Sequence, residues 1–421
     1  MMPRSARRLA LAICVLSGCR SDTDATDGDT SSSGDSTSST STSTTSSSTT
    51  IAPESSGAAE TSTSSDGPAD SSSSSGGCTT DCDAPPTTLW EVSRDGEAHN
   101  DDRFAAVAIA DDGAVIVNGF VAEATPSRDV AVVAFAADGT ESWAYVTGAS
   151  AQDDVGTDVA IVDGDVVATA TRDGTAMQWL ARIDEGVAAW EYEASGSAHT
   201  VAVLGGGIVA GGVADARGYV GAFDGNDGTP AWTWSSPIAG GCATCDRILD
   251  VEVLANADIA AVGARGEDGT AVVVRLSPDG SEIWSAADDA PGTALRLTAE
   301  ASGDLLVIVR DDEEVTQLRR YPGDGSGHLQ LPSDPDEQLA DIASDPLGGW
   351  VVAANLADGV AIRHYDARDA IAWADTRDAP ADGELIVSAI AVDGAGEVAA
   401  CGTRRVDDVT GYDGWVIVLA P

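Results

Sequence analysis

The amino-acid sequence predicts an all-β fold built from repeated four-stranded units. Three observations carry this prediction: a tryptophan that returns at a regular interval, an Asp-Gly turn that precedes it by a constant step, and short β-branched runs between these marks. Outside the first residues of the chain, no helical period is sustained. Short apolar runs bounded by turn residues are typical of strands.

The repeat is marked by a turn glycine and the tryptophan four residues after it, as in Gly139 and Trp143. The marks are Trp90, Trp143, Trp190, Trp232, Trp284, Leu329 and Trp373, with Pro86 replacing the turn glycine before the first and Asp369 replacing it before the last. Their mean spacing is about 47 residues, and a period of this length with strand-like content is typical of a β-propeller.

Each interval contains the same series of elements. After Trp90, we expect strands over residues 104–110, 114–120, 128–136 and 140–146, separated by Asp-Gly turns that predict hairpins. The third run is apolar on both faces, with Val130, Val132 and Ala134 alternating with Ala131, Val133 and Phe135. We therefore expect this strand to be buried between two neighbouring sheets, and the tryptophan of the fourth strand to cover the gap to its neighbour.

The marks bound seven sets of first, second and third strands, and the chain stops at Pro421, where another fourth strand would begin. An unpaired fourth strand stands at the other end, in Thr87–Val92. We therefore predict a single propeller of seven four-stranded antiparallel blades over residues 87–421. Thr87–Val92 should close the ring by pairing with Trp415–Leu419, which removes an exposed sheet edge.

The first repeat resembles the SBBP-type and PQQ-like β-propeller repeats of bacterial surface lipoproteins. The shared pattern is carried by Asp102, Gly113, Gly119, Asp129, Gly139 and Trp143, and Gly394, Gly402 and Asp413 repeat part of it in the last unit. The resemblance covers residues 87–421 and implies a propeller fold; it does not imply a particular activity.

Residues 1–18 are expected to be a secretory signal peptide, because Arg4, Arg7 and Arg8 precede a short apolar run from Leu9 to Leu16. The sequence Leu-Ser-Gly-Cys that ends at Cys19 resembles the lipobox of bacterial lipoproteins. The resemblance implies cleavage before Cys19, a lipid on that residue, and export to the outer membrane or cell surface. Residues 19–86 are rich in Ser, Thr and Asp, which predicts a disordered tether.

The charge of the chain excludes one class of partner. The formal net charge is −47, from 69 acidic residues against 22 basic ones, and every basic residue is an arginine. Such a surface repels nucleic acid and anionic lipid. We expect no nucleic acid partner, a monomer, and contact with the membrane only through the lipid on Cys19.

The cysteines and histidines form no recognisable catalytic motif. Cys78 and Cys82, and likewise Cys242 and Cys245, are close in sequence, and in an exported protein they predict two local disulfides. Cys242 and Cys245 could alternatively form half of a zinc site, although a tetrahedral site needs four ligands. Cys401 is expected to be a buried free thiol, and His99, His199, His328 and His364 are scattered.

One set of carboxylates recurs around the first strand of several units: Asp102, Asp154, Asp158, Asp246, Asp250, Glu337 and Asp341. In a propeller, the connections that enter these strands gather near the central channel. The set could form an acidic channel mouth that captures a cation such as Ca²⁺ or a basic partner. Alternatively, these carboxylates hydrogen-bond loop backbone amides. No cofactor is otherwise expected.

These features favour a lipid-anchored, non-enzymatic scaffold that binds a protein, a peptide or an envelope polysaccharide. Two alternatives remain open at the level of the sequence. One is a quinone- or calcium-dependent propeller enzyme, an oxidoreductase or a lyase, although seven compact blades are fewer than the eight usual in quinone dehydrogenases. The other is a lipoprotein that assists envelope assembly.

Overall fold

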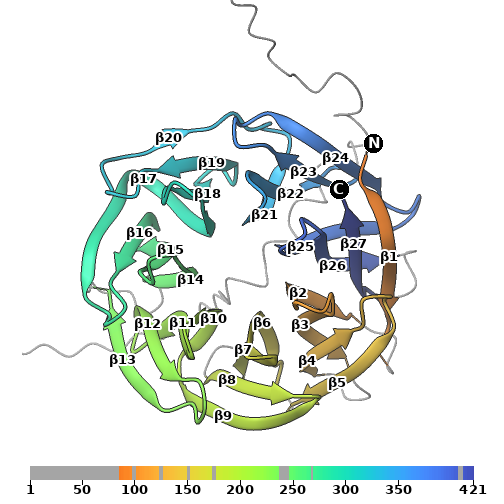
Figure 1. Ribbon diagram of the computed structural model, residues 1–421, viewed down its shortest axis with the longest axis horizontal. Helices are drawn as coiled ribbons and strands as arrows, with labels where there is room; N and C mark the ends of the chain where they lie inside the picture. The colour runs from red at the N-terminus through yellow and green to blue at the C-terminus, as the bar shows by residue number, and fades with distance from the viewer. Residues whose placement is uncertain are drawn as a thin grey trace, which may run out of the picture.

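The computed structural model contains strands, turns and bends in its described residues, and no helix among them. The described residues are 85–96, 101–122, 127–148, 152–172, 177–236, 246–266, 269–405 and 411–421. Figure 1 shows the sheets arranged around a central axis, with one edge strand of each near the axis and the opposite edge at the rim. The predictions for Cys19, the tether to residue 84, the pairs Cys78/Cys82 and Cys242/Cys245, and His99 lie outside the described residues.

The strands form antiparallel sheets whose order follows the chain. Five sheets have four strands each, and a sixth has seven because the long strand β17 (Glu282–Ala299) belongs to two sets. Its first part pairs with β16 and its second part with β18. The all-β prediction and its repeated antiparallel hairpins are confirmed.

The strands take four positions between the axis and the rim. The first, innermost position is held by β2 (Arg103–Ile109), β6 (Val155–Val162), β10 (Ser197–Leu204), β14 (Arg247–Val253), the second part of β17, β21 (Gln338–Ser344) and β25 (Glu384–Val392). The second is held by β3 (Val115–Ala122), β7 (Asp165–Arg172), β11 (Gly207–Ala214), β15 (Ile259–Arg265), β18 (Leu305–Asp311), β22 (Trp350–Leu356) and β26 (Val398–Arg405).

The third position is held by β4 (Arg128–Phe135), β8 (Met177–Asp184), β12 (Arg217–Asp224), β16 (Thr270–Leu276), β19 (Thr316–Tyr321), β23 (Gly359–Tyr365) and β27 (Asp413–Ala420). The fourth, outermost position is held by β5 (Glu141–Thr147), β9 (Val187–Ser195), β13 (Pro230–Ser235), the first part of β17, β20 (Leu329–Gln330), β24 (Ile371–Asp378) and β1 (Thr87–Arg94).

The first strand of the chain lies beside the last. β1 pairs antiparallel with β27, and this pairing places Trp90 opposite Val418 and Ser93 opposite Trp415. Figure 1 shows β1 and β27 in the same sheet, with β1 at the rim. This is the pairing expected between Thr87–Val92 and Trp415–Leu419, and it satisfies backbone groups that would otherwise form an open edge on β27.

The hydrophobic core is divided among the spaces between neighbouring sheets. One cluster joins β2–β4 to β6–β8, and another joins β2–β4 to β25–β27, with Phe104, Val133 and Val416 buried in it. β4 contributes to both, because Val130 and Val132 face the first cluster while Val133 and Phe135 face the second. The predicted burial of this strand on both faces is confirmed.

The repeated tryptophans lie over the turns of the next sheet. The indole of Trp90 covers Gly139, that of Trp190 covers Gly228, and that of Trp232 covers Gly280. Each indole N–H also donates to a carbonyl of the same turn: Trp90 Nε1 to Ala137 O at 3.0 Å, and Trp232 Nε1 to Pro278 O at 3.1 Å. The turn glycines have φ between +70° and +82°, which side chains disfavour, and the indole leaves no room for a Cβ.

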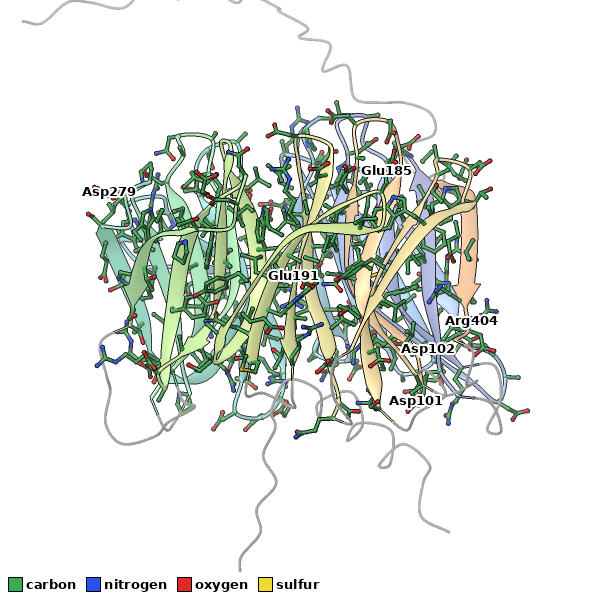
Figure 2. All side chains as sticks on the ribbon, turned by 90° about the horizontal axis from the view of Figure 1, so that it is seen from below. Asp101, Asp102, Glu185, Glu191, Asp279 and Arg404 are labelled. Carbon is green, nitrogen blue, oxygen red and sulfur yellow. The ribbon has the colours of Figure 1, made fainter. Side chains whose placement is uncertain are left out.

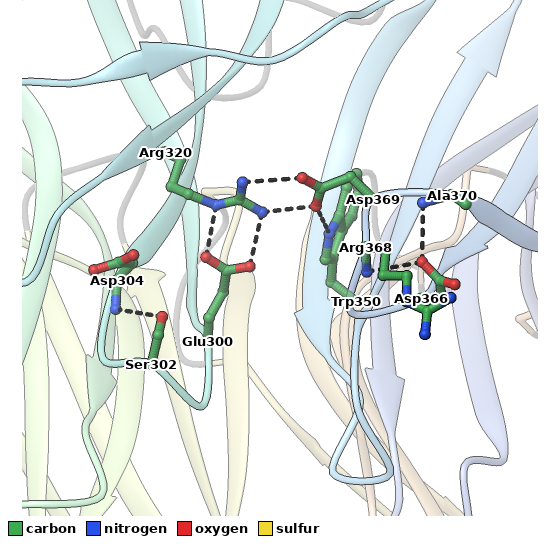
Figure 3. Close-up of polar contacts among 9 residues, drawn as sticks. All are labelled: Glu300, Ser302, Asp304, Arg320, Trp350, Asp366, Arg368, Asp369 and Ala370. Atoms are coloured by element: carbon green, nitrogen blue, oxygen red, sulfur yellow. Dashed lines mark hydrogen bonds and ion pairs between the residues drawn. The ribbon is translucent and has the colours of Figure 1, made fainter. Parts of the chain in front are cut away.

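The contact is replaced by an ion pair where the repeat departs from its pattern. Leu329 stands at the tryptophan position and is exposed, and Asp369 stands at the glycine position of the next sheet with φ of 61°. Figure 3 shows Arg320 between Glu300 and Asp369; its Nη2 lies 2.8 Å from Glu300 Oε1 and 2.7 Å from Asp369 Oδ1. These hydrogen bonds lower the pKa of Asp369. The Arg320–Asp369 ion pair therefore joins the two sheets at the place where the repeat lacks its indole.

The two ends of the ring differ in their connections. At one end, the turn end, short turns connect the first strand of each unit to the second and the third strand to the fourth, as residues 136–140 and 277–281 do for the third and fourth strands. At the other, the loop end, the described connections vary in length, from the single residue Gly196 between β9 and β10 to residues 331–337 between β20 and β21. Figure 2 shows Glu185 and Asp279 toward the turn end and Asp101 and Asp102 toward the loop end.

The indole contact can be tested at Gly280, where a Cβ would lie 2.5 Å from Cε3 of Trp232. We expect Gly280→Ala to lower the free energy of unfolding by about 1–2 kcal/mol for the left-handed backbone and by a further ~1–3 kcal/mol for displacing the indole. Gly303→Ala is the matched control, because Gly303 has φ of +87° and no atom within 4 Å of its Cβ position. Equal losses in urea unfolding of the two variants would show that the indole does not constrain the turn.

Candidate functional site

Each innermost strand carries an irregularity at an equivalent place. The pairing register shifts between Phe104 and Ala106 in β2, between Gly156 and Asp158 in β6, and likewise in β10, β14, β17, β21 and β25. Such a bulge leaves one residue unpaired and frees backbone groups from the ladder. The residues that follow the shift, here named the bulge ring, are Ala106, Asp158, Thr200, Asp250, Arg296, Asp341 and Ala389.

The bulge ring surrounds a cavity of about 180 Å³ on the central axis. Six of the seven residues of the bulge ring line it; Thr200 is the exception. The polar groups of the lining come from Thr157, Asp158, His199, Asp250, Arg296 and Asp341. Three carboxylates, one guanidinium and one imidazole therefore share a small space in the middle of the protein.

The carboxylates of the bulge ring bind the backbone of the following sheet. Asp158 Oδ2 accepts a hydrogen bond from Val201 N at 2.7 Å, Asp250 Oδ2 from Leu297 N at 2.8 Å, and Asp341 Oδ2 from Ile390 N at 2.8 Å. Thr200 does the same with its hydroxyl, which accepts from Val251 N at 3.1 Å. Each side chain thus satisfies an N–H that the bulge in the next strand releases.

Arg296 is the counter-ion of the ring. Its Nε lies 3.5 Å from Asp341 Oδ1, and its Nη1 donates to Leu295 O at 3.0 Å. The charges of Asp341, Asp250 and Asp158 raise the pKa of its guanidinium although burial alone would lower it. Sequence reasoning missed this residue; the signal was an arginine at the repeat position where other units have aspartate.

Protonation of the cavity is governed by burial. Burial raises the pKa of Asp250 to about 8 and that of Asp341 to about 6, and Arg296 partly opposes both shifts. Burial also raises the pKa of Glu252, on the same strand as Asp250, to about 7. His199 is shifted the other way, to about 4, again chiefly by burial.

His199 is therefore neutral at physiological pH, and its tautomer follows from its partners. Its Nδ1 lies 2.8 Å from Ile248 O, which can only accept, so Nδ1 carries the proton. Its Nε2 then accepts from Ser197 Oγ, 2.9 Å away. Both ring nitrogens are used within the protein, and the ring positions the start of β10 against β14.

The other predicted carboxylates lie outside the cavity, near the loop end. Asp102 accepts from Ala122 N at 2.7 Å and from Gly96 N, and Asp246 accepts from Gly266 N and from Ser236 Oγ, both at 2.8 Å. Asp154 is buried 3.8 Å from Arg172 Nε, and Glu337 binds Arg363. The structure thus divides the seven predicted carboxylates into an axial group of Asp158, Asp250 and Asp341 and a group of four that hold loop amides or arginines.

The remaining candidates have structural surroundings. Cys401 is free and fully buried between the first and last sheets, and burial raises the pKa of its thiol. Within the described ranges, no three His, Cys, Asp or Glu side chains are grouped as ligands for a metal ion. Nor does any described segment form a helix long and apolar enough to cross a membrane.

Neither a known family model nor a curated protein sequence matches this chain. Solved structures do. The Pan2 WD40 domain of Neurospora crassa aligns with a TM-score of 0.55 over 80% of this chain and 95% of its own, at 12% identity. The fold is a β-propeller. Virginiamycin B lyase from Staphylococcus aureus aligns with a TM-score of 0.52 over 79% and 98%, also at 12% identity.

A chain of the mitotic checkpoint complex gives a TM-score of 0.51 over 79% of this chain and 91% of its own, at 11% identity. The similar propellers thus include both a lyase and a WD40 domain. Fold similarity at this level of identity does not choose between catalysis and binding, so the function must be argued from the site.

The raised pKa of Asp250 predicts how the stability of the propeller depends on pH. The native state holds a proton on Asp250 up to about pH 8, while the unfolded chain releases it near the model value of 3.8. Because the native state binds more protons in this window, the free energy of unfolding decreases as pH rises from about 4 to 8. Asp341 and Glu252 act in the same direction, and His199 in the opposite one below about pH 6.5.

We expect Asp250→Asn to remove part of this decrease, so that the variant loses about 1–3 kcal/mol less stability than the parent between pH 5 and 8. Asparagine keeps the acceptor for Leu297 N. Asp111→Asn is the control, since Asp111 lies in an exposed turn. Urea unfolding at several pH values gives the comparison, and parallel curves for parent and Asp250→Asn would refute the assignment.

Proposed function

We propose that this protein is an exported, lipid-anchored β-propeller that acts as a non-enzymatic binding scaffold. The observation that carries the proposal is the state of the axial polar groups. Each bulge-ring carboxylate accepts a backbone N–H of the next sheet, both nitrogens of His199 have partners, and Arg296 balances the carboxylates. The residues most suited to chemistry are therefore used to join sheets.

The surfaces available for a partner differ between the two ends. At the turn end, aspartates such as Asp138 and Asp366 accept backbone N–H bonds within their own turns, and these bonds lower their pKa values. Loops that vary in length on a rigid framework are where propellers and other scaffolds carry recognition. We therefore assign binding of a protein, peptide or polysaccharide to the loop end.

We further propose that the ring has seven blades and that β1 supplies the fourth strand of the last one. Two features support this closure: β1 pairs with β27, and one apolar cluster joins β2–β4 to β25–β27, with Trp90 packed against it. Dividing β17 between two blades gives every blade four strand positions.

Deletion of residues 87–92 tests the closure. We expect the deletion to lower the free energy of unfolding by at least ~3 kcal/mol, because it removes the contacts of the half-buried Trp90 and a whole strand pairing. Deletion of residues 20–77 is the control and should leave the unfolding midpoint unchanged. If the two truncations unfold at the same urea concentration, the last sheet does not depend on β1.

The anchor is tested by Cys19→Ala. We expect the variant to remain uncleaved or to leave the membrane fraction, because no thiol is present to carry the lipid. Native mass spectrometry of the parent, purified from its own host in mild detergent, should show the lipid mass together with any partner. Lipid labelling that persists in Cys19→Ala would refute the anchor, and a stoichiometric redox cofactor in the parent would refute the non-enzymatic role.

A further inference from the structure

In six of the innermost strands, the residue that follows the bulge-ring position donates its backbone N–H to an axial side chain. In β10, β14, β17 and β25 the acceptor belongs to the preceding sheet, as Asp158 Oδ2 does for Val201 N. In β6 and β21 the acceptor is the carboxylate of the same strand. Val159 N donates to Asp158 Oδ1 at 2.8 Å, and Ile342 N donates to the Asp341 carboxylate and lowers its pKa.

Val107, in β2, occupies the seventh of these positions. The register of β2 shifts between Phe104 and Ala106, at the place equivalent to the shifts in the other innermost strands, so Val107 N takes the equivalent direction. The two ring positions that serve this N–H elsewhere are Ala389 in the preceding sheet and Ala106 in the same strand, and both end in a methyl group. Val107, Ala106 and Ala389 all line the central cavity. A buried N–H needs an acceptor, and the cavity is the space from which one can approach.

The same two alanines shape the cavity. Because β21, β25, β2 and β6 are successive neighbours around the axis, the ring order there is Asp341, Ala389, Ala106 and Asp158. Two methyl groups thus lie side by side in the ring, with a carboxylate on either side of them. This part of the ring is here named the alanine gap. The cavity measures about 180 Å³, and one of about 150 Å³ is enough to hold benzene.

The polar groups of the cavity favour an uncharged ligand. Arg296 lies 3.5 Å from Asp341 and offsets its charge, and Asp250 is protonated at neutral pH because burial raises its pKa to about 8. An ammonium group has no lone pair to accept from Val107 N, and a ligand carboxylate would lie between Asp341 and Asp158. A hydroxyl group accepts from an N–H and donates to a carboxylate at the same time.

We propose that the alanine gap binds an uncharged hydroxylated ligand, a small polyol or one unit of a sugar, through the Val107 N–H and the carboxylates of Asp158 and Asp341. One hydroxyl oxygen accepts from Val107 N, and hydroxyl protons are donated to the two carboxylates, which form stronger hydrogen bonds than neutral acceptors do. The methyl groups of Ala106 and Ala389 contact the carbon atoms of the ligand. The proposal deepens the binding role and rests on it only in taking the ligand to be bound and not converted.

The test follows the Val107 N–H signal by ¹H–¹⁵N NMR of the intact mature protein labelled with ¹⁵N-valine. Val107→Ile removes this signal and so assigns it. Glycerol represents a free polyol and methyl glucoside a linked sugar unit, while methylammonium and acetate at matched ionic strength are the charged references. We expect a saturable shift with at least one hydroxylated probe and none with either reference.

Ala389→Asn should weaken binding of that probe about tenfold or more, because the amide fills the gap and accepts from Val107 N as Asp341 accepts from Ile390 N. The Val107 signal of the ligand-free variant should shift for the same reason. Ala391→Asn is the matched control, since it adds the same amide two residues further along β25, at a position that does not line the cavity. If Ala389→Asn does not fold, the smaller Ala389→Ser replaces it.

No saturable shift with either hydroxylated probe would show that water alone serves the Val107 N–H, and would overturn the site. Unchanged affinity in Ala389→Asn, or an equal loss in Ala391→Asn, would overturn it as well. None of these results would bear on the lipid anchor or on loop-end binding, which depend on other residues. Conversely, a probe that binds in the gap and is chemically altered would uphold the site while refuting the non-enzymatic role.

Discussion

The structure depends on how each sheet packs against the next. Near the rim, that packing rests on an indole lying over a glycine turn of the neighbouring sheet. A glycine is needed there for two independent reasons. The turn requires positive φ, and the indole occupies the space of a Cβ, as at Gly139 and Gly280. The indole N–H also donates to the same turn, so the contact sets orientation as well as distance. Repetition of this contact around the axis explains the constant step between turn and tryptophan.

A second contact joins the sheets at the axis. In four of the innermost strands, β10, β14, β17 and β25, an N–H beside the bulge donates to an oxygen of the preceding sheet, from Asp158, Thr200, Asp250 or Asp341. Buried carboxylates need compensation, and Arg296 provides it. The polar centre is therefore part of the framework, and this is why the cavity by itself is weak evidence for catalysis. We therefore propose the loop end as the surface for recognition.

Much of the fold was predictable because it follows from local pattern. Asp-Gly turns specify hairpins, continuous apolar runs specify strands buried on both faces, and an unmatched strand at the start of the chain suggests a partner at its end. The strands observed in the first interval, β2 to β5, lie within about two residues of those expected from pattern, which is the usual uncertainty of strand ends. The exceptional pair Leu329 and Asp369 was visible as a break in the repeat, but its compensation through Arg320 was not, because Arg320 lies on a different strand from either residue.

The candidate site was predicted less well. The seven acids recur at similar places in sequence, yet Asp158, Asp250 and Asp341 face the axis while Asp102, Asp154, Asp246 and Glu337 hold loops and arginines. The two kinds of position are four residues apart, as in Asp154 and Asp158, and a bulge lies between them. This bulge decides which carboxylate faces the axis, and no local sequence pattern predicts a bulge. Arg296 was missed for the same reason.

The sequence by itself determined the class of fold, the period of the repeat and the order of strands, since these depend on residues close together in the chain. Only the tertiary structure decided which side chains meet at the axis and which charges are balanced there. Those properties depend on the distances between sheets that are about one repeat apart or, for Ala106 and Ala389, at opposite ends of the chain. Burial and pairing are properties of that packing, and they set the protonation and the availability of each group.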